Sequence, residues 1–312
     1  MKLQSRWLTA LPFALVAATY GLVVLGSSVR AYEAGLACPD WPLCFGEAVP
    51  AFNLEIAFEV GHRYLAGFIS LVFVVVSVLA LRNPHLRRRA GPWIGVGAIV
   101  LATQIVFGAL TVTELLSPPV VTTHLILGNT FSALLFGLAL TLREAGFPRR
   151  RAPVGTLPKV AAGVLAVTLF AQLALGGLVS ASHAGLACGT WPSCNGNGWF
   201  PTVEGLVGLQ VMHRITAYTL ATVAFGVFFS SRMRGRFGAA SGVLVLVVIG
   251  QVVLGILNVM NQLPESVTIL HSAGAAALVL LTLFLNLEAW RAPASAAISR
   301  HHGVAFAAQE AV

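Results

Sequence analysis

The stretch GLACPDWPLC at residues 35–44 returns as GLACGTWPSC at residues 185–194, an offset of 150. Both copies keep Gly-Leu-Ala-Cys, then Trp-Pro, then a second cysteine. A histidine-arginine pair follows each copy, at His62-Arg63 and at His213-Arg214. A repeat of about half the 312-residue length predicts a chain built from two halves on one plan.

The repeat continues into the second part of each half. Gln104 and His124 return as Gln251 and His271, an offset of 147. Each half therefore carries two histidines and one cysteine pair, which is typical of a metal or haem site made twice. We expect an N-terminal half over residues 1–152 and a C-terminal half over residues 153–312, with the function depending on how the two copies differ.

The composition predicts a membrane protein. Hydrophobic residues make up 57% of the chain and charged residues 10%, whereas a soluble domain has about 25% charged residues. Eight apolar runs of roughly 20 residues are each long enough to cross a bilayer as a helix; they lie near 8–29, 58–81, 92–113, 120–142, 158–180, 208–230, 240–260 and 267–289. We predict an all-α polytopic membrane protein with eight transmembrane helices arranged as two four-helix bundles. The first run is long for a cleaved signal segment, so we expect it to be retained.

The basic residues predict the orientation. Of the 19 lysines and arginines, 16 fall in alternate segments, from Lys2 and Arg6 at the N-terminus to Arg291 and Arg300 in the C-terminal tail. The positive-inside rule then places both termini in the cytoplasm. The net charge of +8 is thus a topology signal. Because no basic patch is interleaved with aromatic residues, nucleic-acid binding is excluded.

All four cysteines fall in predicted outer loops, where disulfides persist. We expect one local disulfide in each loop, Cys38 with Cys44 and Cys188 with Cys194. Three interpretations stay open at this point. Each ring could stiffen a lid over the membrane, the first pair could be redox-active, or the pairs could bind zinc, although no histidine stands at finger spacing beside them.

Four of the eight histidines lie inside apolar helices, each about five residues from the outer end; they are His62, His124, His213 and His271. Polar side chains in lipid are expensive and usually mark a functional site. One such histidine alone could simply join two helices, but four at matched depth favour bis-histidine ligation of haem iron. Zinc would want further ligands. We expect His62 to pair with His124 and His213 with His271, with pairing between halves left open.

The other polar residues near these histidines have two interpretations. Arg63 and Arg214 either reach toward the outer headgroups or bind haem propionates. Gln104 and Gln251 are expected to form hydrogen bonds between helices. His85, His301 and His302 fall in cytoplasmic segments, and His183 falls in an outer loop.

The two copies differ in charge. Glu59 stands three residues before His62, and the corresponding residue before His213 is Gln210, each on the same helical face as its histidine. In the loops, Arg30, Glu33 and Asp40 align with Ser180, His183 and Thr190. A carboxylate at the low-dielectric edge of a haem pocket suits proton transfer. The first half is therefore expected to be the reactive site and the second a cofactor site, unless Glu59 simply faces the outer aqueous surface.

This pattern resembles the haem A synthase family over residues 8–290. The resemblance rests on the Glu59-Val60-Gly61-His62-Arg63 motif, the histidine pair in each half and the cysteine pairs in the first and third outer loops. It implies oxidation of a ring methyl of haem O to the formyl group of haem A, for cytochrome oxidase. By this resemblance, His62 and His124 would bind the substrate haem, and His213 and His271 a haem b cofactor. Glu59 would assist the oxidation, and Cys38 with Cys44 would be the functionally important pair.

The resemblance further implies a multi-pass protein of the cell membrane that works with haem O synthase, cytochrome oxidase assembly factors and membrane lipid, and that could form homo-oligomers. Two rival functions remain. A cytochrome b-type electron carrier would have similar histidine pairs but no need for the difference between Glu59 and Gln210. A membrane thiol-disulfide oxidoreductase would use the outer cysteines but leave four intramembrane histidines idle.

Overall fold

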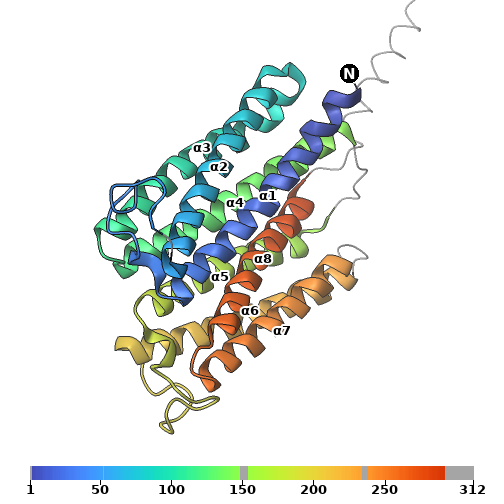
Figure 1. Ribbon diagram of the computed structural model, residues 1–312. Helices are drawn as coiled ribbons and strands as arrows, with labels where there is room; N and C mark the ends of the chain where they lie inside the picture. The colour runs from blue at the N-terminus through green and yellow to red at the C-terminus, as the bar shows by residue number, and fades with distance from the viewer. Residues whose placement is uncertain (1, 52, 148–153, 234–237, 292–312) are drawn as a thin grey trace, which may run out of the picture.

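The computed structural model describes residues 2–51, 53–147, 154–233 and 238–291, and this part of the chain is built from long helices (Figure 1). They are α1 Lys2–Ala31, α2 Leu54–Arg82, α3 Pro84–Thr113, α4 Pro118–Gly146, α5 Thr156–Ala181, α6 Gly205–Met233, α7 Gly238–Met260 and α8 Glu265–Trp290. Two short 3₁₀ turns, η1 Ala34–Leu36 and η2 Ala184–Leu186, follow α1 and α5. Within these described ranges, eight helices are long and apolar enough to cross a membrane, which confirms the predicted all-α class and the predicted eight helices.

The residues at the helix ends explain where the helices begin. Asn53 caps α2 by accepting a hydrogen bond from the Ile56 amide at 2.7 Å, because the first amides of a helix have no partner within it. Asn83 ends α2 and at the same time caps α3, accepting from the His85 amide at 3.0 Å. Pro84 occupies the first turn of α3, where a missing amide hydrogen costs nothing. The connection between α2 and α3 is therefore a single residue.

The helices pack as two groups of four. Leu15, Phe73, Ile94 and Leu135 come from α1, α2, α3 and α4 and share one apolar core. A second core contains Leu165, Leu220, Leu244 and Leu285, one from each of α5 to α8. This arrangement is compatible with the predicted pair of four-helix bundles. The predicted boundary between residues 152 and 153 lies outside the described residues and stays a prediction.

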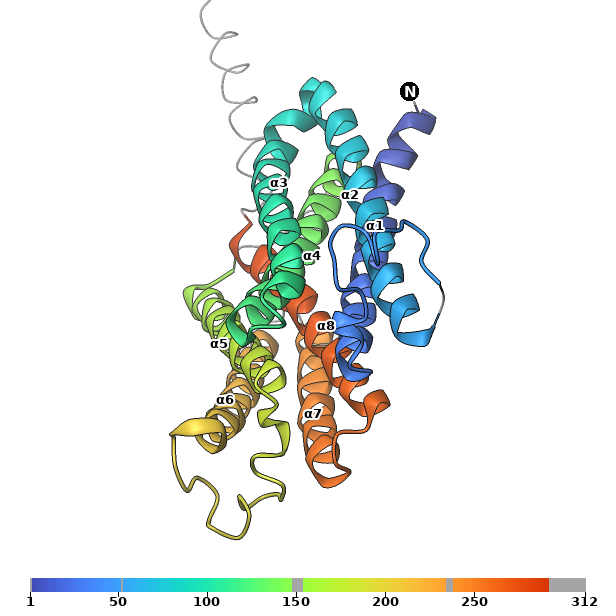
Figure 2. The same ribbon diagram turned by 60° about the vertical axis from the view of Figure 1, so that its left-hand side comes forward.

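The two groups meet through α1 and α4 on one side and α5 and α8 on the other, as the turned view shows (Figure 2). The Tyr20 hydroxyl of α1 donates to the Ala273 carbonyl of α8 at 3.0 Å. At the end of α1, Arg30 donates to the Ser180 carbonyl of α5 at 2.8 Å and lies 3.2 Å from the His183 ring. The halves are thus joined by polar contacts in addition to apolar packing.

The outward faces of the helices are apolar. Phe68, Leu71, Ile99 and Val167 are between 60% and 72% exposed, and all four lie within membrane-length helices. A water-soluble monomer rarely exposes apolar surface on this scale, whereas hydrocarbon covers it without cost. The chain is a multi-pass membrane protein.

The backbone itself repeats in the loops. Glu33 and His183, at equivalent positions before η1 and η2, both have a φ of 54°. The loops after α1 and α5 lie at the same end of the helices, opposite the α2–α3 turn (Figure 1). Each loop is closed by the expected disulfide, Cys38–Cys44 in the first and Cys188–Cys194 in the second. The predicted pairing of the cysteines is therefore confirmed.

Candidate functional site

Each of the four intramembrane histidines lies against a glycine on a neighbouring helix. A Cβ atom added to Gly26 of α1 would lie 3.1 Å from Nε2 of His62 in α2, and one added to Gly108 of α3 would lie 3.1 Å from Cε1 of His124 in α4. The second half repeats this arrangement with Gly176 against His213 at 3.0 Å and Gly255 against His271 at 3.5 Å. Because glycine has no side chain, each imidazole ring can come close to the facing helix. We call each of these four sites, where a histidine ring lies against a glycine, a glycine cradle.

The histidines also occupy equivalent positions along their helices. His62 stands eight residues after Leu54, the first residue of α2, and His213 stands eight residues after Gly205 in α6. His124 and His271 each stand six residues after the first residues of α4 and α8. The helices begin two to four residues before the apolar runs, so the rings lie deeper than the five residues expected, about 9–12 Å from the helix starts.

The donor atoms fit an iron porphyrin. His62 lies within electrostatic reach of His124, and His213 within reach of His271. Among the described residues, Nδ1 of His124 and Nδ1 of His271 are buried without a hydrogen-bond partner. Buried polar atoms of this kind ordinarily have a partner, and a pair of imidazoles between helices is a known way to hold haem iron. The residues present therefore suit one haem in each half.

Gln104 forms an interhelical hydrogen bond, as expected, and its partner is a candidate ligand. Its amide nitrogen lies 3.2 Å from Nε2 of His124. Gln104 therefore contacts the second histidine of the first half. Gln251 of α7 lies against Gly274 of α8, three residues beyond His271.

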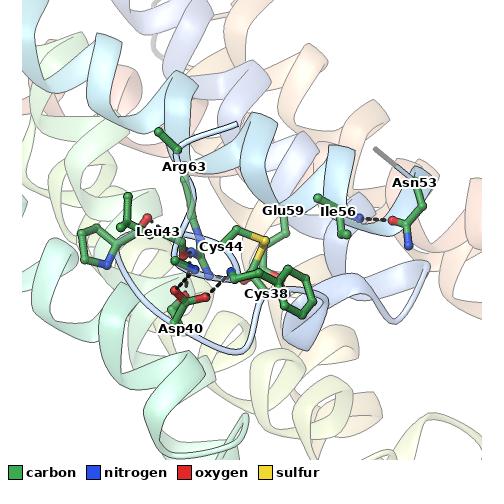
Figure 3. The surroundings of a disulfide bond; sticks show 12 residues. Cys38, Asp40, Leu43, Cys44, Asn53, Ile56, Glu59 and Arg63 are labelled. Carbon is green, nitrogen blue, oxygen red and sulfur yellow. Dashed lines mark hydrogen bonds and ion pairs between the residues drawn. A yellow bond between two sulfur atoms is a disulfide. The ribbon is translucent and has the colours of Figure 1, made fainter. Parts of the chain in front are cut away.

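Glu59 is buried beside the first disulfide ring (Figure 3). One carboxylate oxygen accepts a hydrogen bond from the Cys38 amide at 2.9 Å, and the other accepts from Arg63 at 2.5 Å. Arg63 also donates to the carbonyls of Asp40 at 2.9 Å and Leu43 at 2.5 Å. With 6% of its surface exposed, Glu59 does not face the outer water, and that alternative is wrong.

The equivalent residues of the second half make different contacts. Gln210 donates to the Gly185 carbonyl at 3.0 Å and forms no pair with Arg214. One terminal nitrogen of Arg214 donates to the carbonyls of Cys188 and Thr190, both at 2.9 Å. The other, Nη1, is buried and has no partner within the described part of the chain. Arg214 thus retains a free donor, whereas Arg63 directs one terminal nitrogen to Glu59 and the other to loop carbonyls.

A polar network around His213 could not be anticipated from the repeat motifs alone. Gln172 of α5 places its amide nitrogen 3.2 Å from Nδ1 and 3.3 Å from Nε2 of the ring. The Thr216 hydroxyl donates a hydrogen bond to the side-chain carbonyl oxygen of Gln172. The available signal was a comparison of polar residues between the halves, because Leu22 and Leu65 stand at the equivalent positions of the first half.

The loop charges are not gathered around the first site alone. Asp40 closes the first ring by accepting from the amides of Phe45 at 2.6 Å and Gly46 at 2.8 Å. These hydrogen bonds, above all the one from Gly46, hold the pKa of Asp40 below its ordinary value. Arg30 joins the two halves through Ser180 and His183. His85 lies in the first turn of α3, and His301 and His302 lie outside the described residues.

Known proteins match both halves of the chain. Residues 7–60 and 51–283 match the family described as cytochrome oxidase assembly protein, COX15-CtaA. The chain is 30% identical to a Heme A synthase of Shewanella oneidensis, over 94% of this chain and 99% of that protein. It is 27% identical to a Heme A synthase of Maricaulis maris, over 92% and 95% of the two chains. A Heme A synthase of Alkalihalophilus pseudofirmus is 30% identical, over 86% and 91%.

Proposed function

The chain belongs to the COX15-CtaA family of cytochrome oxidase assembly proteins, and from this premise we propose that it is a membrane oxidoreductase that converts haem O to haem A. The reaction oxidises a ring methyl group to a formyl group. The observation that carries the proposal is Glu59, which is the one buried carboxylate among the described residues. It lies one helical turn from His62 and is tied to the first disulfide ring. The corresponding position of the second half is an amide, so acid–base chemistry is assigned to the first half.

In the proposed reaction the first half binds the substrate. His62 and His124 hold the iron of haem O, and the glycine cradles leave the rings close to the facing helices. Written with water as the oxygen donor, the methyl group and one water molecule give the formyl group, four protons and four electrons. Glu59 would accept protons in this step, and the electrons would leave one at a time through the second haem to an external one-electron acceptor. The Cys38 amide and Arg63 fix the position of the Glu59 carboxylate.

The second half holds a resident haem b in this proposal. His213 and His271 are the iron ligands, and the free Nη1 of Arg214 is the donor for a propionate. Arg63, by contrast, would have to release Glu59 before binding a propionate with that nitrogen. Haem b, when bound, supplies one-electron transfer. The uncharged Gln210 leaves the second site without a proton acceptor at this position.

The proposed setting is the cell membrane, with both termini in the cytoplasm and both disulfide loops outside. The cysteines support this orientation because structural disulfides persist in oxidising compartments. We further propose that haem O synthase supplies the substrate and that cytochrome oxidase assembly factors receive the product.

Haem extraction tests this function directly. Membranes from cells that make this chain together with a haem O source are extracted with acid and the haems are separated by chromatography. We expect haem A with the wild-type chain, and haem O without conversion in cells that lack the chain. Unconverted haem O in the presence of abundant, folded chain would contradict the proposed activity and favour an electron carrier.

A further inference from the structure

Gln172 and Thr216 form a hydrogen-bonded support behind the first candidate ligand of the second half. The amide nitrogen of Gln172 lies within 3.3 Å of both ring nitrogens of His213, and the amide oxygen of Gln172 accepts a hydrogen bond from the Thr216 hydroxyl. The Thr216 oxygen also lies 3.0 Å from the Met212 carbonyl and 3.1 Å from the His213 carbonyl. The contacts thus run from the His213 ring through the Gln172 amide and the Thr216 hydroxyl to the backbone of α6, the helix that carries His213.

The first half lacks both members of this support. Leu22 of α1 and Leu65 of α2 stand where Gln172 and Thr216 stand in the second half. A leucine side chain can neither donate nor accept a hydrogen bond. Both rings nevertheless lie close to a glycine of the neighbouring helix, since a Cβ atom added to Gly26 would lie 3.1 Å from Nε2 of His62 and one added to Gly176 would lie 3.0 Å from Cε1 of His213. The two rings therefore share a glycine neighbour but differ in their polar contacts.

We propose that Gln172 and Thr216 are positioning residues that fix the ring of His213 as the permanent ligand of a resident haem. The same positions in the first half leave His62 free to turn, so its haem can be bound and released. This inference rests on the proposed function, in which the second half retains a haem and the first half exchanges one. It names the residues that make one site a cofactor site and the other a substrate site.

The network has the chemistry that a haem ligand needs. An imidazole that coordinates iron through one nitrogen donates its remaining N–H to a nearby acceptor, and that acceptor orients the ring. A half-turn of the Gln172 amide exchanges its oxygen and nitrogen in place. The oxygen then accepts from the His213 N–H, and the nitrogen donates to the Thr216 oxygen. The Thr216 hydroxyl in turn donates to the Met212 carbonyl, so every polar group has a partner.

The strength of this acceptor affects the iron electronically. An acceptor on the outer N–H makes the imidazole more electron-rich, which favours ferric over ferrous iron and lowers the reduction potential. Removing the acceptor raises the potential, and a carboxylate in its place lowers it further. A residue that merely filled space would not produce opposite shifts with leucine and glutamate.

The experiment compares Gln172→Leu and Gln172→Glu with the wild type, each purified with its bound haem. We expect Gln172→Leu to raise the potential of the second-half haem and to lose haem to a scavenging apoprotein at least about tenfold faster. Gln172→Glu is expected to lower the potential and to retain haem. A wild-type potential and wild-type haem loss in Gln172→Leu would overturn the inference.

A matched pair of Thr216 variants tests the inference even if the Gln172→Leu protein is unstable. Thr216→Ser keeps the hydroxyl and should behave as the wild type, whereas the isosteric Thr216→Val should shift the potential in the same direction as Gln172→Leu. Equal behaviour of Thr216→Ser and Thr216→Val would overturn the assignment of Thr216. Wild-type protein that retains no haem in its second half would instead overturn the proposed function on which the inference rests.

The reciprocal exchange tests the first half. A Leu22→Gln, Leu65→Thr double variant places both members of the network beside His62. We expect it to purify with several-fold more haem O than the wild type, because the substrate is now held as the cofactor is. Unchanged retention of haem O would overturn the claim that the two leucines keep the first site exchangeable.

Discussion

The N-terminal halves of α2 and α6 carry the same His-Arg pair, but the two arginines make different contacts. In α2, Arg63 is joined to Glu59 at 2.5 Å and to carbonyls of the first disulfide loop. In α6, Arg214 binds carbonyls of the second loop and keeps Nη1 free. One side-chain difference, Glu59 against Gln210, therefore decides whether the arginine pairs with a carboxylate or keeps one terminal nitrogen without a partner. Two sites of like geometry acquire different chemistry in this way.

The largest difference between the halves is expected when the proposed haem ligands are replaced. We expect His62→Ala or His124→Ala to abolish haem A formation, because the substrate loses a ligand. His213→Ala or His271→Ala should instead lower the haem that co-purifies with the protein. Pigment spectra of purified protein and extracted haems from whole membranes measure the two effects separately. Equal haem loss from all four variants would contradict the division of labour between the halves.

Replacing the single buried carboxylate tests the asymmetry itself. Glu59→Gln copies the choice of the second half and keeps an acceptor for the Cys38 amide. It removes the proton acceptor, so we expect haem A formation to fall about 10²–10⁴-fold, with normal protein level and haem b content. The rate of haem A formation after haem O is supplied measures the change. Gln210→Glu is the matched control and should leave haem A formation within a few-fold of the wild type.

Replacing one cysteine of each disulfide in turn should distinguish the roles of the two loops. Each ring closes over a sequence separation of 6, and losing such a short closure costs about 2 kcal/mol in the unfolded-chain account. Cys38→Ser should reduce haem A formation as well, because the Cys38 amide and the loop carbonyls hold Glu59 and Arg63. Cys188→Ser should act on thermal stability and haem retention. Identical profiles for both variants would argue that the first loop has no special connection to catalysis.

The smallest expected effect concerns Asp40. Its folded pKa lies below the ordinary value, so its contribution to loop stability is complete above the ordinary carboxyl pKa and is lost as the pH falls through the folded pKa. We expect hydrogen exchange at the Phe45 and Gly46 amides to accelerate, relative to wild-type protein at the same pH, in Asp40→Asn. In the second ring, Thr190 and Asn195 accept the loop hydrogen bonds in place of a carboxylate. Acidification should therefore loosen the first loop, where Asp40 becomes protonated, and should have no corresponding effect on amide exchange in the second loop. A matching acid response in both loops would refute this role of Asp40.

The sequence predicted the helices well because their signal is collective. Some 20 apolar residues in a row leave few alternatives in lipid, and the repeat identified the histidines and the cysteine pairs twice over. The predicted starts of the helices were a few residues late. In α2, for example, Asn53 caps the helix and Glu55 lies in its first turn, and a hydropathy pattern does not count such polar residues. The caps depend on single hydrogen bonds, which a run of residues does not reveal.

The partners of side chains were harder to predict than their positions. Arg63 was identified as a polar residue near the outer surface, but its contacts with Glu59 and the loop depend on how the chain turns between Ala31 and Leu54. Gln172 stands among apolar residues with no repeat to single it out, and its contact with His213 joins residues 41 positions apart. The reach of Arg30 across to Ser180 likewise depends on how the halves dock, which no local pattern encodes.

The left-handed backbone positions have a consequence for the history of the molecule. Among the described residues, the non-glycine positions of positive φ fall into matched pairs, Glu33 with His183, Phe45 with Asn195, Leu115 with Gln262 and Leu116 with Leu263. Three of these pairs differ in chemistry while keeping the same turn. After a gene duplication, such turns can preserve the scaffold while individual side chains drift toward new roles. Because the turns match, we expect that the loops between these positions can be exchanged between the halves without changing the course of the backbone.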